Sequence, residues 1–166
     1  MTINNLLAGN LGATASYLIS SDTPPASDTL TLLANDGGNT GSGGALTGSD
    51  TATINIGALN DAPTATITPA TYAATEQTSL TLHGTGLSIA DVDAGSASVT
   101  ATLSVVSGAL TVTAGTTGAA VSGSGTNSVT LTGTLTKINN LLAGNLGATA
   151  TYIISSDTPP ASDTLT

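Results

Sequence analysis

Cysteine, tryptophan and phenylalanine are absent from this chain of 166 residues, and positive charge is almost absent as well. Without cysteine, no disulfide can stabilise the fold. Lys137 is the one Lys or Arg against ten acidic residues, and the formal charge is −9. Such a chain cannot neutralise the phosphates of a nucleic acid, so nucleic acid is excluded as an expected partner.

Long apolar runs are also missing. No stretch reaches the roughly 18 apolar residues that cross a bilayer, so membrane insertion is not expected. The first residues, MTINNLLAGNLG, lack the basic region of a signal peptide. The aromatic residues are three tyrosines, so a core must be built from Leu, Ile, Val and Ala, which bury little area per side chain.

Catalytic motifs are missing too. His83 is the single histidine and has no second histidine or cysteine with which to bind zinc. No G-x-S-x-G motif is present, and Gly123-Ser124-Gly125 has no phosphate-binding lysine, which favours a hairpin turn. We therefore expect no enzyme, and we expect His83 to face solvent at a strand end.

What the chain does contain is a long internal duplication. Residues 2–31 recur as residues 137–166, an offset of 135 positions, and only Thr2/Lys137, Ser16/Thr151 and Leu18/Ile153 differ. A period of 135 residues is the size of an ordinary domain and much longer than a solenoid repeat. The duplication predicts a tandem array of domains that each bury a core.

Alternation of Thr or Ser with aliphatic residues is the main local pattern and predicts half-buried strands. We expect about eight strands in each period, separated by turns rich in Gly, Asn and Pro, and hence an all-β, antiparallel sandwich. The predicted strands lie at residues 28–34, 51–56, 64–68, 79–82, 98–105, 110–113, 128–132 and 148–155, the last duplicated at 13–20.

Two segments depart from this alternation. Ile138, Leu141 and Leu142 have helical spacing and are followed by Gly144, so residues 135–144 predict one short helix, with a copy at residues 2–9. Residues 35–48 (NDGGNTGSGGALTG) are too polar and too rich in glycine for a strand and predict a loop.

Several motifs follow one another in a recognisable order. They are Leu-Asn-Asp-Ala-Pro at residues 59–63, Glu76, Leu-Ser-Ile-Ala-Asp-Val-Asp-Ala-Gly at 87–95, and Val-Thr-Leu-Thr-Gly-Thr-Leu at 129–135, together with the glycine-rich loop. This order resembles the cadherin-like repeats of giant bacterial adhesins, including VCBS-type repeats and the extender arrays of RTX adhesins. The resemblance implies an immunoglobulin- or cadherin-like fold with calcium between consecutive domains.

The resemblance also implies the calcium ligands, namely Asn60 and Asp61 in the linker, Asp91 and Asp93 as a D-x-D pair, and Glu76. Calcium prefers six to eight oxygen ligands, and neighbouring carboxylates on an irregular segment can share one ion. The alternative is that Asn and Asp serve turns through bonds to the backbone. Asp36 and Asp50, which flank the glycine-rich loop, are candidates for a second calcium site, and Asp50 is equally suited to cap a turn.

The resemblance to adhesin repeats leads us to expect an extracellular module on a bacterial surface, either as an adhesin extender or as part of a filament or biofilm matrix. Its partners would be neighbouring repeats or other copies of the chain. Two other functions stay open. One is glycan binding, with Tyr17, Tyr72 and Tyr152 as stacking platforms. The other is an ice-binding-like array of Thr pairs, such as Thr64/Thr66, Thr100/Thr102, Thr111/Thr113 and Thr130/Thr132.

If the repeat boundary lies at residues 60–63, residues 1–59 are the C-terminal part of one repeat and residues 60–166 the N-terminal part of the next. Neither part is then complete. Residues 32–59 correspond to the elements that the second part lacks. Because an uncompleted sheet exposes a strand edge, we expect chains to complete one another head to tail as a filament.

Overall fold

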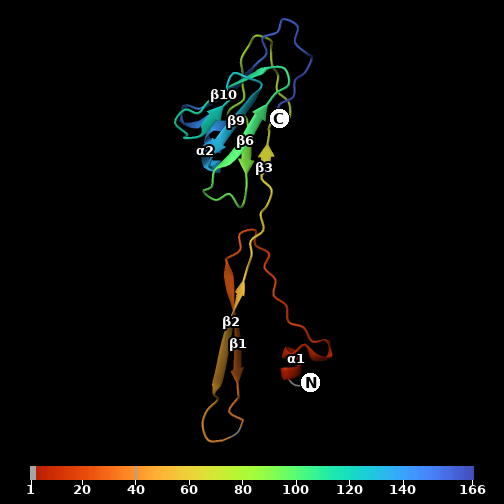
Figure 1. Ribbon diagram of the computed structural model, residues 1–166, viewed down its shortest axis with the longest axis vertical. Helices are drawn as coiled ribbons and strands as arrows, with labels where there is room; N and C mark the ends of the chain where they lie inside the picture. Colours follow the sequence, from red (N-terminus) through yellow and green to blue (C-terminus); the bar gives the residue numbers. More distant parts are fainter. Residues whose placement is uncertain (1–2, 40) are drawn as a thin grey trace. The chain divides into compact units, whose positions relative to one another are not determined.

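The computed structural model describes residues 3–39 and 41–166 and consists mainly of antiparallel β-sheets with few helices. It divides into two compact units, Met1–Leu59 and Asn60–Thr166 (Figure 1). The division falls at the Asn-Asp-Ala-Pro segment of residues 60–63.

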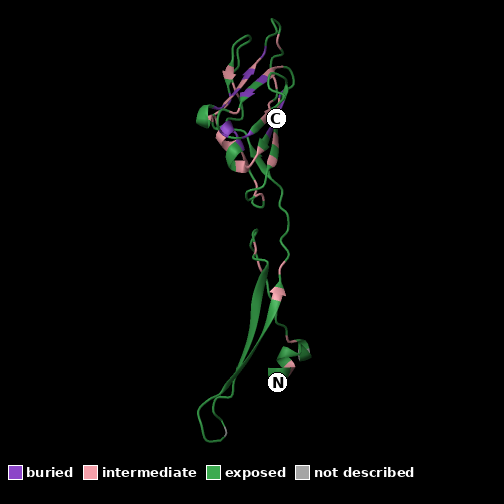
Figure 2. Ribbon diagram, turned by 60° about the vertical axis from the view of Figure 1, so that its left-hand side comes forward, coloured by how far each residue is buried: buried purple, intermediate pink, exposed green. Residues whose placement is uncertain are grey.

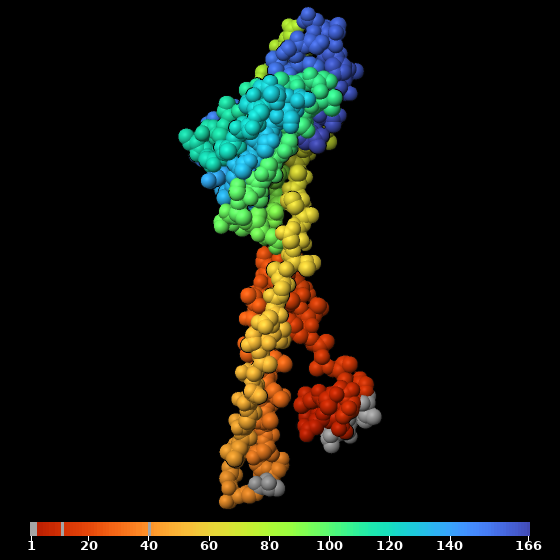
Figure 3. Space-filling view, viewed as in Figure 1, coloured from red at the N-terminus to blue at the C-terminus, as the bar shows by residue number. Residues whose placement is uncertain are grey.

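Unit 1 is built around one long hairpin. Strand β1 (Ser27–Asn35) pairs antiparallel with β2 (Thr47–Asn55), in a register that sets Leu30 opposite Ala52. The two segments of the hairpin lie side by side in the space-filling view (Figure 3). A short helix α1 (Ile3–Leu7) and a 3₁₀ turn η1 (Asn10–Gly12) precede the hairpin. No residue of unit 1 whose burial is described is buried (Figure 2). The hairpin is thus a paired ribbon without a core of its own.

Unit 2 contains three antiparallel sheets. Their orders are β4-β10-β7, β6-β9-β8 and β3-β5. The strands are β3 (Thr64–Thr66), β4 (Leu80–Thr81), β5 (Ser88–Ala90), β6 (Val99–Ser104), β7 (Ala109–Thr113), β8 (Ala120–Ser122), β9 (Ser128–Gly133) and β10 (Thr149–Ile153).

The core of unit 2 is a single cluster made almost wholly of aliphatic side chains. Leu110 of β7, Leu131 of β9 and Ala150 of β10 all belong to it, so both three-stranded sheets contribute. Tyr152 is the one aromatic residue among the buried members. Thr lies on the opposite face of the same strands, for example Thr111 of β7, which is exposed. This alternation is what the Thr-aliphatic pattern predicts.

Helix α2 (Leu135–Leu142) covers one part of this core. The side chain of Thr134 accepts a hydrogen bond from the Lys137 amide and caps its start. Ile138, Leu141 and Leu142 are buried, as their helical spacing predicts. Gly144 then takes the left-handed conformation (φ 73°) and begins a 3₁₀ turn, η2 (Asn145–Gly147).

The helical part of the duplicated segment has the same local structure in both units and opposite environments. Helix α1 and turn η1 repeat α2 and η2. Ile138, however, is 0% exposed and its counterpart Ile3 is 77% exposed. Tyr152 is 7% exposed and Tyr17 is 47% exposed. The segment is therefore part of the core in unit 2, and unit 1 alone does not bury its copy.

Several sequence-based boundaries need correction. Residues 13–20 form no strand, although their copy includes β10, because β10 is held by β4 and β7 on its two sides. Strands β5 and β8 were not predicted, because neither lies in a longer run of Thr or Ser alternating with aliphatic residues. The described residues contain ten strands. Strand β2 also begins at Thr47, four residues before the predicted start at Thr51.

Candidate functional site

The start of unit 2 lies against the turn that follows β5, where the backbone of Asp61 meets the side chain of Asp93. The antiparallel pairing of β3 with β5 sets Thr64 opposite Ala90, so the segment that precedes β3 meets the turn after β5. The Asp61 amide donates to Asp93 Oδ2 at 2.5 Å. The Asp93 amide donates to Asp91 Oδ1 at 2.9 Å, which makes an Asx turn of the D-x-D segment. Both predicted roles, turn former and ion ligand, thus concern the same side chains.

The other two predicted ligands differ in position. Asn60 is adjacent, and its side-chain amide donates to the Asp61 carbonyl at 3.3 Å. Glu76 instead lines a separate cavity together with Ile154 and Asp163. The described residues contain no group of three or more His, Cys, Asp or Glu side chains that could hold a metal ion. A calcium ion at the linker would need carbonyl and water oxygens to complete its shell.

Asp36 closes the glycine-rich loop through its own carboxylate. Its Oδ1 accepts hydrogen bonds from the amides of Gly38 at 2.8 Å and Leu46 at 2.9 Å. These bonds lower the pKa of Asp36. Asp50 lies within β2 opposite Leu32, about 10 Å along the strand from Thr47 at ~3.3 Å per residue. The structure therefore does not bring Asp36 and Asp50 together.

Asp163 is the most heavily hydrogen-bonded carboxylate in unit 2. It accepts from the Tyr152 hydroxyl at 2.9 Å and from the Gly108 amide at 3.0 Å. The amides of Val106, Ser107 and Thr164 also donate to it. Asp163 thus fastens the end of the chain to the turn between β6 and β7.

The electrostatics of this pair follow from its partial burial. Desolvation opposes ionisation of Asp163, but the hydrogen bonds from Tyr152 and the backbone amides outweigh it and lower the pKa of the carboxyl. Burial, followed by the bond to Asp163 and its negative charge, raises the pKa of Tyr152 to about 12. The pair is therefore a neutral phenol bonded to a carboxylate.

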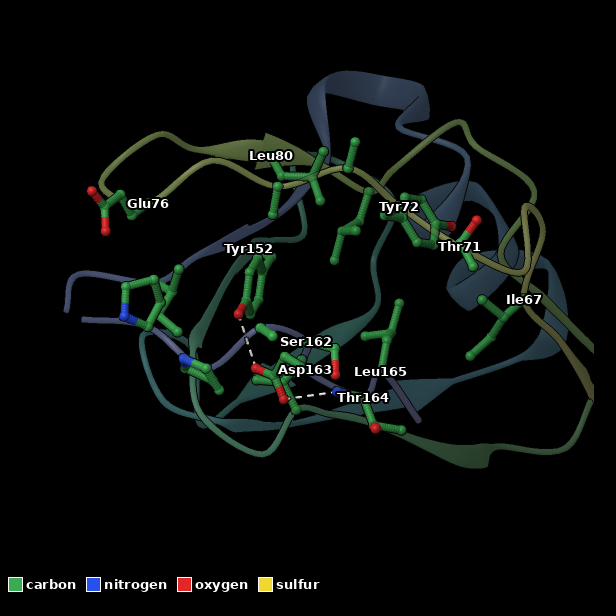
Figure 4. A pocket seen from close by; sticks show the side chains of 18 of the residues that line it. Ile67, Thr71, Tyr72, Glu76, Leu80, Tyr152, Ser162, Asp163, Thr164 and Leu165 are labelled. Atoms are coloured by element: carbon green, nitrogen blue, oxygen red, sulfur yellow. Dashed lines mark hydrogen bonds between the residues drawn. The ribbon is translucent and has the colours of Figure 1, made fainter. Parts of the chain in front are cut away.

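Unit 2 contains two hollows. The first, about 630 Å³, is lined by Ile67, Tyr72, Leu80 and Tyr152 on one side and by Asp163 to Leu165 on the other (Figure 4). The second, about 360 Å³, is lined by Val99–Thr102 of β6 and by Pro63 to Ala65. The walls of both are mainly small or aliphatic side chains.

The three tyrosines differ in their suitability as stacking platforms for a glycan. Tyr152 is buried, so its ring is not available to a sugar. Tyr72 is half-buried and its hydroxyl bonds the Thr68 carbonyl at 3.2 Å and Thr85 at 2.8 Å. Tyr17 is exposed and its hydroxyl donates to Asp28 at 3.0 Å.

The prediction that His83 faces solvent is wrong. It is half-buried, and its Nδ1 accepts the Ala150 amide at 3.0 Å. A Cβ at Gly144 would overlap the imidazole ring, so glycine leaves the space that the ring fills. His83 therefore supports the packing of α2 and β10.

Comparisons with protein families, with curated proteins and with solved structures gave no match. None of the helices in the described residues is long and apolar enough to cross a bilayer.

Proposed function

We propose that this chain is a non-catalytic structural module of an extracellular tandem array, which extends an adhesin or builds a filament on a bacterial surface. The observation that carries the proposal is the duplicated segment in its two environments. Ile138 and Tyr152 belong to the core of unit 2, and the same residue types at Ile3 and Tyr17 are exposed in unit 1. A segment of this kind serves a protein in which domains of one sequence follow one another.

The resemblance of the linker and D-x-D motifs to adhesin repeats supports an immunoglobulin- or cadherin-like sandwich with calcium at the junctions. The Asp61 amide donates to Asp93 Oδ2 at 2.5 Å, so the linker lies next to the D-x-D turn. This arrangement is compatible with an ion that stiffens the entry to unit 2. Asn60, Asp91 and Asp93 would provide further oxygen atoms, with carbonyl groups and water completing the shell. Glu76 is not part of this proposed set, because it lines a different cavity.

The test is the growth of the particle with the number of repeats. The chain is compared with a version lengthened by one further 135-residue period, by small-angle X-ray scattering in calcium. For an extension module, the maximum dimension increases by about the length of one domain with each period, and the cross-section stays constant. A lengthened chain that becomes rounder, with little gain in maximum dimension, would reject the proposal.

A further inference from the structure

Strand β7 is the last strand of its sheet, and other parts of unit 2 bond to its outer edge. In the order β4-β10-β7, β10 pairs with one edge of β7. On the other edge the Leu110 amide donates to the Thr126 carbonyl, and the Gly125 amide donates to the Leu110 carbonyl, both at 2.7 Å. In an antiparallel ladder alternate residues face alternate edges, so Val112 is the next residue that faces outward.

A side chain takes the place of a strand at Val112. The Val112 amide donates to Ser124 Oγ at 2.9 Å, and the same hydroxyl donates to the Val112 carbonyl at 2.8 Å. A hydroxyl can do both, because it has one donor and two acceptor lone pairs. Just beyond β7 the Ala114 carbonyl accepts from the Thr117 amide and hydroxyl, at 3.2 and 2.8 Å. This edge is closed, in the sense that the carbonyls of Leu110, Val112 and Ala114 are already hydrogen-bonded.

The turn between β8 and β9 holds Ser124 in this position. Gly123 and Gly125, on either side of it, have φ of 80° and 86°, which favours glycine. A Cβ at Gly123 would overlap the Ser128 carbonyl oxygen. The Thr126 hydroxyl bonds the Gly123 and Ser128 carbonyls at 2.7 and 2.8 Å. The predicted hairpin turn at Gly123-Ser124-Gly125 is thus confirmed, and its serine hydroxyl lies at the edge of β7.

The edge of β5 is closed in a similar way by helix α2. Strand β3 pairs with one edge of β5. On the other edge the Ile89 amide donates to Asn139 Oδ1, and Asn139 Nδ2 donates to the Ile89 carbonyl, both at 2.9 Å. A side-chain amide offers the same donor and acceptor as a peptide group, so Asn139 bonds to Ile89 as a further strand would. Ile89 is the middle residue of the three in β5.

Closed edges matter in a protein built from copies of one sequence. A free edge is a template for a strand of another chain, and charged residues or proline on an edge strand usually prevent such pairing. Strand β7 reads Ala-Leu-Thr-Val-Thr and has neither. Neighbouring repeats supply similar strands at high local concentration, and misassembly between domains is a characteristic failure of repeat proteins. Strand β7 therefore needs another form of protection.

We infer that Ser124 and Asn139 close the edges of β7 and β5 against strand addition by a second copy of this domain. The inference rests on the proposed structural function for its purpose, whereas the closure itself is a property of unit 2. A copy can pair with β7 only after both bonds between Ser124 and Val112 are broken. The domain thus keeps other copies apart at this edge.

The first experiment measures hydrogen exchange of the backbone amides of the full chain by NMR. Ser124→Ala removes the acceptor of the Val112 amide, whose exchange is expected to accelerate about tenfold or more. Ser122→Ala, at an exposed serine of β8, is the matched control and leaves the exchange of Val112 unchanged. Ser124→Thr keeps a hydroxyl and restores slow exchange.

The Leu110 amide is the internal reference of this experiment, because it bonds to the backbone of the same turn. In Ser124→Ala its exchange is expected to stay close to that of the parent chain. Equal acceleration of Leu110 and Val112 would mean that the hydroxyl is not what closes the edge. Unchanged exchange of Val112 in Ser124→Ala would overturn the inference as well.

The second experiment measures self-association of the full chain by sedimentation velocity over a range of concentrations. Ser124→Ala is expected to raise the weight-average mass about twofold or more at the highest concentration, and Ser122→Ala is expected to match the parent chain. Pairing at β7 protects the Val112 amide again, so its exchange in Ser124→Ala slows as the concentration rises. Association without this slowing, or an exposed Val112 amide without association, contradicts the inference.

Asn139→Ala tests the edge of β5. We expect the Ile89 amide to exchange about tenfold faster, the Val112 amide to be unaffected and self-association to rise. Asn140→Ala, at the adjacent asparagine of α2, is the control. Equal exchange of Ile89 in the two variants, or no rise in association, removes Asn139 from the inference. The growth of particle length with repeat number is measured on parent chains, so failure of edge closure is distinct from failure of the structural function.

Discussion

The Tyr152 hydroxyl donates a hydrogen bond to Asp163 Oδ2 across 2.9 Å, and the copied pair Tyr17 and Asp28 makes the same bond across 3.0 Å. The repeated sequence thus encodes this bond in both copies. Only in unit 2 does the carboxylate also meet the amides of the turn at Val106 to Gly108. The same pair therefore contributes different amounts to the free energy of unfolding in the two units.

Replacing each tyrosine by phenylalanine should reveal this difference. Tyr152→Phe removes a donor from a carboxylate that is partly shielded from water, and we expect it to lower the free energy of unfolding by about 1.5–3 kcal/mol. Tyr17→Phe removes an exposed bond and should change it by less than about 0.5 kcal/mol. Urea unfolding followed by far-UV circular dichroism measures both, and equal losses would contradict the different roles.

Acid should weaken unit 2 through Asp163. Its pKa is lowered in the folded protein, so the unfolded chain binds more protons as the pH falls. The stabilisation is complete above the ordinary Asp pKa of about 4 and is lost as the pH falls through the lower folded value. The parent chain should therefore lose more stability between about pH 5 and pH 2 than Asp163→Asn does. Parallel losses in the two proteins would argue against the ionised pair.

Alkali should act through Tyr152. Its pKa of about 12 lies above the ordinary value of 10, so the folded chain keeps its proton while the unfolded chain loses it. Stability then falls as the pH rises from about 10 to about 12. Tyr152→Phe lacks this phase, which thermal unfolding at a series of alkaline pH values would detect. A phase of the same size in both proteins would assign it to another group.

The two copies of the helix allow a matched test of burial. Ile138→Ala should cost about 2–5 kcal/mol because it opens a cavity beneath α2, where Ile138 is fully buried. Ile3→Ala, in the exposed copy, should change the free energy of unfolding by less than about 0.5 kcal/mol. A large effect of Ile3→Ala in the monomer would mean that unit 1 has a core in solution.

Removal of calcium tests the linker. If an ion binds at Asp61, Asp91 and Asp93, a chelator lowers the melting temperature of the parent chain and leaves that of Asp93→Asn unchanged. Asp50→Asn serves as the control, because Asp50 lies in unit 1 on β2, and it should respond to the chelator as the parent does. Calorimetry with and without calcium measures the difference. An identical response of Asp93→Asn and the parent chain would place any bound calcium elsewhere.

The parts of the fold that the sequence predicts are those encoded locally. Helix α2 follows from the spacing of Ile138, Leu141 and Leu142 and from the Thr134 cap, and α1 repeats it without tertiary packing. Residues 13–20 have nearly the sequence of the β10 region and form no strand, because pairing with β4 and β7 decides whether a strand exists. Strand formation here is thus a property of neighbours that alternation cannot reveal.

In the candidate sites, too, some residues are close because of their spacing in the sequence and others only because of strand pairing. The proximity of Asp91 and Asp93 follows from their spacing, and Asp61 joins them only through the pairing of β3 with β5. Glu76 and Asp163 share a cavity that no spacing in the sequence indicates. A signal for Asp163 was nevertheless present, because the duplication preserves both Tyr152 and Asp163 at the same separation as Tyr17 and Asp28.

The absence of buried residues in the described part of unit 1 has a consequence for long arrays. A hairpin of two strands is only marginally stable in water until further surface covers it. Each repeat in the interior of an array would have both neighbours, whereas a terminal repeat has one. Stability would therefore rise with the number of repeats, and unfolding would begin at the ends.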